Sequence, residues 1–401
     1  MAEESFTEIT SLSWGRRIIG SLKAILFGGL LIILAIGVLW WNEGRAVKRS
    51  QALDEGAGQV VSVTADRIDD ANEGKLVHLT GRATTQQTLV DPQFNIRAQA
   101  IKLYRDVQMY QWQEREDSET REKLGGGTET VTTYSYAKGW EDRRINSTGF
   151  KQPDGHQNPD HMPYGEWRTH ATDVTLGAFR LSSGLIDEID KSTPVALDQD
   201  AGIRLPTPNS QLNGNEIYVG ANPHSPQIGD IRIQFKAVYP TDVSVVSMQR
   251  GESFAPYVAS NGNQIELLEY GNLTSQEMFQ AAQDRNTYLT WGIRVGGFIL
   301  VFIGLRMLLA IVPILAAVIP AIGALVDFAT GLLSFLLAGA VTLITTASAW
   351  IFYRPLLGTA LLIVAALLMV GLKWVRKNKL VPPPQPAMQG MATASPPPPP
   401  A

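Results

Sequence analysis

The chain contains no cysteine among its 401 residues. Disulfides, thiolate metal sites and cysteine nucleophiles are therefore excluded together, and a folded domain must be held by an ordinary apolar core. Charged residues are also scarce, at 18% of the chain, where soluble proteins have about 25%. The formal net charge of −4 gives no sign of the basic surface that binds nucleic acid. The sequence instead has long uncharged runs, which indicate a membrane protein.

The first uncharged run is Ala24–Trp41. At about 1.5 Å of rise per residue it can cross most of a hydrocarbon core about 30 Å thick. Trp40 and Trp41 close it, as amphipathic rings do at the headgroup level. A cleaved signal peptide is the alternative, but its apolar region would be shorter. We therefore expect an uncleaved transmembrane helix over residues 24–41.

A second apolar cluster lies near the end of the chain. We divide it into three spans, Val295–Val312, Leu332–Trp350 and Leu356–Leu372. The apolar piece at 313–331 contains Pro320 and Gly323, and proline removes a helical donor and clashes with the preceding turn. We expect an interfacial or re-entrant linker there, with a fifth span as the alternative.

Basic residues flank the outermost spans: Arg16, Arg17 and Lys23 before the first, and Lys373, Arg376, Lys377 and Lys379 after the last. Positive flanks stay in the cytoplasm, so we expect residues 1–23 and 373–401 to be cytoplasmic. Residues 42–288 would then be periplasmic, extracellular or lumenal. The difference in positive charge between the two sides of the membrane is reduced by Arg45, Lys48 and Arg49, which lie just past the first span. The end of the chain is proline-rich and predicts a disordered tail.

The region 42–288 shows the alternation typical of strands. Its clearest stretch is IRIQFKAVY, in which Ile231, Ile233, Phe235, Ala237 and Tyr239 share one face. Thr274 and Glu277 form a capping-box pattern that begins a helix. The predicted fold class is a membrane protein with four transmembrane α-helices and a large β-rich (α+β) extracytoplasmic domain inserted between helices 1 and 2.

No catalytic constellation stands out. The polar stretch 154–170 holds His156, His161 and His170, but their spacing matches no established zinc pattern. Walker, G-x-G-x-x-G and G-x-S-x-G motifs are absent from the sequence. We predict no catalytic, cofactor-binding or metal-binding residues and no cofactor.

Arg306 lies inside a predicted span. A charge there costs about 2.5–3.5 kcal/mol on insertion scales and usually faces protein or water. One hypothesis is an intramembrane contact, with Asp327 as the candidate partner. The other is that Arg306 reaches the nearer headgroups along its aliphatic stem.

Nine pieces of the chain occur in the order found in a known family. They are NEGRAVK (Asn42–Lys48), NEGKLVHLTG (Asn72–Gly81), QMYQWQE (Gln108–Glu114), YSY with INS and F (Tyr134–Phe150), GHQNP (Gly155–Pro159), FRLSSGLID (Phe179–Asp187), GDIRIQF (Gly229–Phe235), TWGIR (Thr290–Arg294) and WIFYRPL (Trp350–Leu356). On these pieces the chain resembles the transmembrane protein 43 family, also called LUMA. The resemblance implies four spans, a large lumenal domain between the first and second, and no established enzymatic activity.

The resemblance also implies a role in organising membrane protein complexes. Animal members lie in the endoplasmic reticulum and inner nuclear membrane and associate with emerin and lamins. We expect a bacterial member, to which those partners do not carry over. Our main hypothesis is a non-enzymatic membrane scaffold that binds membrane lipids, itself as a homo-oligomer, or other membrane proteins, and no nucleic acid. The alternatives are an envelope or lipid-linked sensor and a membrane enzyme acting on lipid or envelope polymer.

Overall fold

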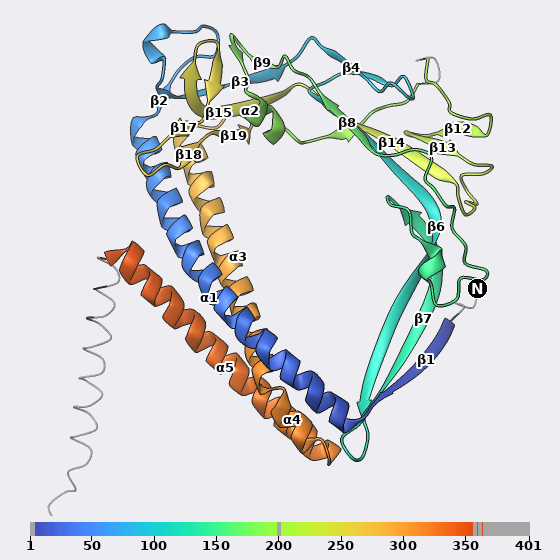
Figure 1. The fold of residues 1–401 in the computed structure, drawn as a ribbon. Coiled ribbons are helices and arrows are strands. Elements are labelled where there is room, and N and C mark those ends of the chain that lie inside the picture. Colours follow the sequence, from blue (N-terminus) through green and yellow to red (C-terminus); the bar gives the residue numbers. More distant parts are fainter. Residues whose placement is uncertain (1–4, 199–201, 356–358, 360–362, 364–401) are drawn as a thin grey trace, which may run out of the picture. The chain divides into compact units, whose positions relative to one another are not determined.

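The computed structural model describes residues 5–198 and 202–355, together with Thr359 and Ile363 (Figure 1). Contacts divide the chain into two compact units, residues 1–346 and 347–401. All contacts discussed below lie within the first unit. In the second, residues 347–353 are helical, and the Arg354 amide donates to the Trp350 carbonyl at 2.7 Å.

The larger β-sheet of the described residues contains β1 (Ser5–Leu12), β6 (Lys102–Glu122), β7 (Thr128–Glu141), β8 (Trp167–His170), β11 (Thr193–Pro194), β12 (Ser210–Asn213), β13 (Glu216–Val219) and β14 (Ile231–Val238). Its strands follow the order β1-β7-β6-β14-β13-β12, with β11 beside β14 and β8 beside β6. All of its pairs are antiparallel.

The second sheet contains β2 (Val61–Ser62), β3 (Leu76–Thr84), β9 (Thr175–Leu176), β10 (Phe179–Arg180), β15 (Thr241–Arg250), β16 (Ser253–Ala255) and β19 (Leu267–Tyr270). Its order is β10-β9-β3-β15-β16, with β19 beside β15 and β2 beside β3. Two small ladders pair β4 (Thr88–Val90) with β5 (Arg97–Gln99), and β17 (Tyr257–Val258) with β18 (Gln264–Ile265). The predicted large β-rich region is therefore confirmed.

Alternating apolar side chains from both sheets form the main core. On β14, Ile231, Ile233, Phe235 and Ala237 are buried as the sequence predicts. The fifth member of that pattern, Tyr239, is exposed because β14 ends at Val238. In the valine-rich stretch GQVVSVT, helix runs to Gln59 and only Val61–Ser62 is a strand.

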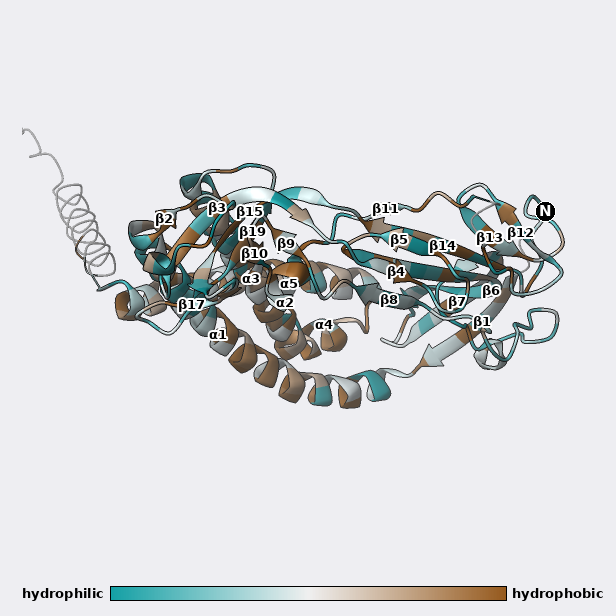
Figure 2. Ribbon diagram, turned by 90° about the horizontal axis from the view of Figure 1, so that it is seen from above, coloured by the Kyte–Doolittle hydropathy of each residue, from teal (hydrophilic) through white to brown (hydrophobic). Residues whose placement is uncertain are grey.

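The helices are α1 (Trp14–Gln59), α2 (Ser183–Glu188), α3 (Ser275–Leu309), α4 (Ile311–Ala316) and α5 (Pro320–Tyr353). Three helical stretches among the described residues, 14–59, 275–316 and 320–353, are long and apolar enough to cross a membrane. Figure 2 shows apolar residues concentrated along α1, α3 and α5. The capping box predicted at Thr274 and Glu277 is present at the start of α3. The predicted fourth span, 356–372, lies outside the described residues apart from Thr359 and Ile363.

The piece expected to be an interfacial or re-entrant linker, residues 313–331, contains the end of α4, a short break, and the first turns of α5. Pro320 begins α5 instead of breaking a helix. The physical reason is that proline at the first helical position loses only an amide that has no intrahelical acceptor in any case.

Helices α1 and α3 run antiparallel and in close contact. Gly28 on α1 faces Gly304 on α3 so closely that a Cβ added at Gly28 would lie 2.6 Å from the Gly304 carbonyl oxygen. Small residues allow this approach of two backbones within a membrane. Further along, Ala52 and Leu53 of α1 and Phe279 of α3 enter a core shared with β15, β18 and β19. The helix pair is thus continuous with the β-rich region.

The start of the chain also joins the β-rich region. Strand β1, which precedes α1, pairs antiparallel with β7 from Ser5↔Ser135 to Leu12↔Thr128. The hairpin of β6 and β7 is long, since the 21 residues of β6 extend about 70 Å at roughly 3.3 Å per residue. Its turn reaches the start of α1, where Arg17 Nη1 donates to the Gly126 carbonyl at 2.6 Å.

This pairing bears on the predicted sides of the membrane. Residues 1–23 and 42–288 lie on opposite sides only if the β6–β7 hairpin passes through the plane of the membrane. The outer part of β6, residues 115–122, is exposed and rich in charge. Open sheet edges and exposed charges do not occur against lipid. The sides of the membrane on which residues 1–23 and 42–288 lie stay a prediction.

Candidate functional site

Polar side chains join α1 to α3 just beyond the first apolar run. Arg45 Nη1 donates to Asn286 Oδ1 at 3.0 Å, and its Nη2 donates to Asn42 Oδ1 at 3.2 Å and to Thr290 Oγ1 at 3.0 Å. Asn42 Nδ2 donates to the Thr290 carbonyl at 3.1 Å. We call these four residues, Asn42, Arg45, Asn286 and Thr290, the clasp. Each buried amide in it has a partner, which fixes the two helices in one register.

An ion pair extends the clasp. Arg294 Nε and Nη2 donate to the two carboxylate oxygens of Glu43 at 2.7 and 2.8 Å. The side chains are 15% and 2% exposed, respectively. Two parallel bonds between guanidinium and carboxylate are the strongest form of such a pair. Burial of one charge without the other would be strongly unfavourable, so each residue requires its partner.

Helical spacing brings these side chains to one interface. Asn286, Thr290 and Arg294 recur every four residues on α3 and so share one face. Asn42 and Arg45 stand three residues apart on α1 and also share a face. Sequence reasoning missed this network, and the four-residue spacing of polar side chains was the signal that could have revealed it.

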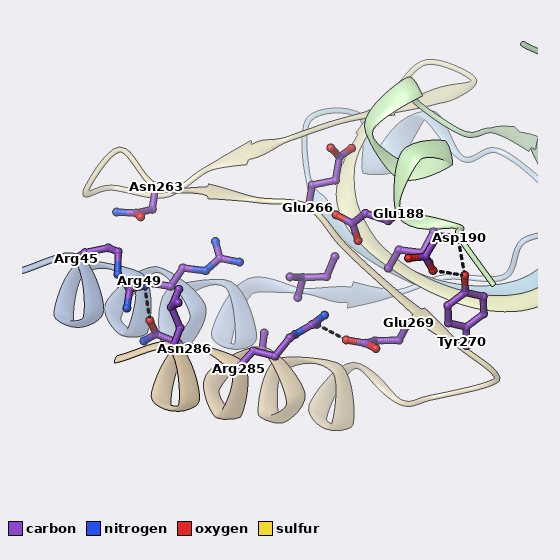
Figure 3. A pocket seen from close by; sticks show the side chains of 14 residues that line it. Arg45, Arg49, Glu188, Asp190, Asn263, Glu266, Glu269, Tyr270, Arg285 and Asn286 are labelled. Carbon is purple, nitrogen blue, oxygen red and sulfur yellow. Dashed lines mark hydrogen bonds and ion pairs between the residues drawn. The ribbon is translucent and has the colours of Figure 1, made fainter. Parts of the chain in front are cut away.

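A cavity of about 630 Å³ opens beside the clasp (Figure 3). Basic side chains from α1 and α3 line one part of it, namely Arg45, Arg49 and Arg285. Acidic side chains from the end of α2 and the segment through β19 line another part, namely Glu188, Asp190, Glu266 and Glu269. The cavity therefore carries charge of both signs, and Arg285 pairs with Glu269 where the two parts meet.

Four groups that line this cavity have perturbed pKa values, and Arg49 and Glu188 are the two that face each other with opposite charge. Burial lowers the pKa of Arg49, and the nearby Arg285 lowers it further, while Glu188 acts in the opposite direction. The surrounding protein reduces the hydration of Glu188 and so raises its pKa, even though part of its surface faces open space. The Leu268 amide opposes this effect on Glu188, whereas Glu266 adds to it. For Arg49 and Glu188 alike, the neighbouring groups do not fully offset the loss of hydration of the charged form.

The structure brings together the two residues singled out in the predicted spans. Arg306 Nη2 lies 2.8 Å from Asp327 Oδ1, and Arg306 Nη1 donates to the Asp327 carbonyl at 3.0 Å. The side chains are 33% and 51% exposed. They line a second cavity, of about 410 Å³, together with Arg17 and Glu122. The contact joins α3 to α5 within one chain; its depth in a membrane stays a prediction.

The three histidines of the stretch 154–170 are not brought together. His156 is buried, with its ring stacked on Tyr136 at 3.9 Å and edge-on to Trp112 at 4.7 Å. His161 and His170 are exposed. Within residues 5–198 and 202–355, no three histidine, aspartate or glutamate side chains are grouped as metal ligands. His156 therefore has a packing role.

Comparison with known proteins gives the family. The model of the family described as Transmembrane protein 43 matches residues 109–355. The chain belongs to the transmembrane protein 43 family. It is 35% identical to transmembrane protein 43 of Rattus norvegicus over 343 residues, which cover 82% of this chain and 85% of the relative. The human protein is 34% identical over 345 residues, with 82% and 85% coverage.

A more distant relative matches a similar share of this chain. The transmembrane protein 43 homolog of Drosophila melanogaster is 32% identical over 356 residues, which cover 85% of this chain and 92% of that protein. No solved structure matches the chain. The names of these relatives describe a membrane protein and no catalysed reaction. This transmembrane protein 43 family member is accordingly a membrane protein with a large β-rich region.

Proposed function

We propose that the chain is a non-enzymatic, multi-pass membrane scaffold, which organises membrane protein complexes through its β-rich region and through lateral association of its helices. The observation that supports this most directly is the apolar surface that α1, α3 and α5 leave exposed. It includes Leu26 and Leu30 on α1, Ile299 on α3 and Phe328 on α5. Side chains of this kind require lipid or another helix around them.

The helices offer faces suited to a second partner. Gly28 of α1 is used within the chain, but Gly29 and Gly37 have open space where a Cβ would be. Small residues on an open helix face allow another helix to approach closely. This supports self-association or binding to other membrane proteins. We include the span at 356–372 in the proposal, which gives four crossings in total.

The alternative function, a lipid-linked sensor, is favoured by one observation. The cavity beside the clasp is lined by α1, α3 and the segment that leads into β19. A ligand there would contact the membrane helices and the β-rich region at once. Such a ligand could alter how the two are joined.

The scaffold proposal is tested with two copies of the full chain carrying different tags, expressed together and crosslinked in native membranes. Purification through one tag, followed by mass spectrometry, should recover the other copy or a constant set of membrane proteins. Crosslinks should map to the open faces of α1, α3 and α5. Recovery of the tagged chain alone, uncrosslinked, at crosslinker levels that capture a known membrane oligomer would overturn the proposal.

A further inference from the structure

The cavity beside the clasp lies at the level expected for lipid headgroups. Trp41 of α1 and Tyr288 and Trp291 of α3 are exposed at the edge of the apolar surface. Tryptophan and tyrosine are enriched where a membrane meets water, because their rings are apolar and their tips polar. Arg45 stands one turn beyond Trp41, and the exposed Leu289 lines the cavity. The cavity therefore adjoins the belt of aromatic side chains.

The basic part of the cavity retains capacity to bind an anion. Arg49 donates from Nη1 to the Gln264 carbonyl at 2.5 Å, yet a guanidinium has five N–H donors. Arg45 uses both terminal nitrogens in the clasp and its Nε is buried, so what it adds beside Arg49 is positive charge. The free N–H donors of Arg49, one helical turn away, form the fork suited to phosphate oxygens.

In the acidic part of the cavity, three of the four carboxylates have a side-chain partner within the protein. Glu269 pairs with Arg285, Asp190 Oδ1 accepts from Tyr270 at 3.1 Å, and Glu266 Oε1 accepts from Ser182 at 2.9 Å. Glu188 has reduced hydration and lies near Glu266, Glu269 and Arg285, and Arg285 is already paired with Glu269. A cation placed beside Glu188 would relieve the repulsion among these carboxylates. The cavity is thus complementary to a molecule with a negative and a positive end.

We propose that this cavity binds the headgroup of an aminophospholipid of the phosphatidylethanolamine type, with its phosphate against Arg45 and Arg49 and its ammonium against Glu188. The shared chemistry is a phosphoethanolamine zwitterion, and the position beside the aromatic belt assigns it to a lipid. A phosphatidylglycerol headgroup would leave the acidic part unpaired. The quaternary ammonium of phosphatidylcholine has no N–H to donate to a carboxylate. The site is independent of the scaffold proposal, because self-association is measured separately.

The test uses the full chain in nanodiscs or detergent, with native mass spectrometry of bound lipid. The probes are phosphatidylethanolamine, phosphatidylglycerol and phosphatidylcholine of matched acyl chains, together with soluble phosphoethanolamine. We expect phosphatidylethanolamine to be retained preferentially. Arg49→Gln should weaken its binding by at least about tenfold, as expected for loss of a charged hydrogen bond. Glu188→Gln should abolish the preference over phosphatidylglycerol while leaving phosphatidylglycerol binding intact.

Matched controls separate the site from general surface charge. Lys48→Gln removes the same charge from the neighbouring exposed position on α1, and Asp284→Asn removes a carboxylate from α3 outside the cavity. Both should bind phosphatidylethanolamine like the unmodified chain. Equal losses in Arg49→Gln and Lys48→Gln would overturn the proposal, as would an unchanged lipid preference in Glu188→Gln. Soluble phosphoethanolamine that binds as tightly as the lipid would overturn the lipid assignment.

Discussion

The two ends of the apolar part of α1 are held by different kinds of contact. At the end near Trp41, the clasp and the Glu43–Arg294 pair bury charged and amide groups between α1 and α3. At the end near Trp14, Arg17 pairs with Glu122 of the hairpin at 2.8 Å, and Trp14 Nε1 donates to the Ile314 carbonyl at 2.8 Å. The second set is more exposed and joins α1 to the β6–β7 hairpin and to α4.

This difference indicates that the contacts near Trp41 contribute more to the stability of the α1–α3 pair than those near Trp14. Buried pairs have no water to replace a lost partner, so their removal leaves an uncompensated charge. Exposed pairs are screened by solvent and contribute little. We therefore expect mutations near the clasp to unfold the junction of helices and sheet, and mutations near Trp14 to release only the hairpin turn.

The largest effect is expected from Glu43→Gln. It leaves Arg294 buried beside a neutral amide, and breaking a buried pair in this way destabilises by about 3–5 kcal/mol. Thermal unfolding of the full chain in detergent provides the measurement. Glu122→Gln is the matched control at the other end, where the loss should stay below about 1 kcal/mol. Equal losses at the two ends would break the comparison.

A smaller effect is expected at the close approach of α1 and α3. In Gly28→Leu the new Cβ would lie 2.6 Å from the Gly304 carbonyl oxygen and 2.8 Å from Met307 Cβ, so the helices must separate. Overpacking of this kind costs about 1–3 kcal/mol. At the neighbouring Gly29 an added Cβ meets no atom within 4 Å, so Gly29→Leu should leave the melting temperature unchanged. Identical melting curves for the two variants would show that α1 and α3 do not pack through Gly28.

The smallest effect is expected from Arg306→Leu. The partly exposed pair with Asp327 should contribute less than about 1 kcal/mol, and loss of the charge favours insertion into lipid. The amount of protein in the membrane fraction should be unchanged, with a melting temperature near that of the unmodified chain. A loss as large as that of Glu43→Gln would mean that this pair is as fully shielded from solvent as the clasp.

Local pattern was sufficient to predict much of the fold. The alternation at 231–237 predicts β14, the pair Thr274 and Glu277 predicts the start of α3, and uncharged runs predict the long apolar helices. Each of these signals lies within a few neighbouring residues. Pro320 shows the limit of such signals, because proline is unfavourable inside a helix and favourable at its first position.

The partners in the clasp and of the N-terminal strand could not be predicted in the same way, although the four-residue spacing marks the polar face of α3. Asn42 contacts Thr290 and Thr7 pairs with Thr133. Both pairings depend on residues far apart in the sequence, and no local period specifies the partner. Arg306 and Asp327 were within reach of prediction because an apolar run makes isolated charges conspicuous. The residues around the cavity had no such background, since they stand among other polar residues.

The central claim is that one folded β-rich region holds α1 at both ends, and the pairing of β1 with β7 tests it most directly. Because the chain has no cysteine, the double variant Thr7→Cys with Thr133→Cys provides a clean disulfide pair at directly opposed positions. In intact membranes, mild oxidation should give an intramolecular disulfide that reduction reverses, whereas Thr7→Cys alone should give none. Absence of the disulfide in the double variant, with both thiols still free to react with a maleimide after oxidation, would contradict the claim.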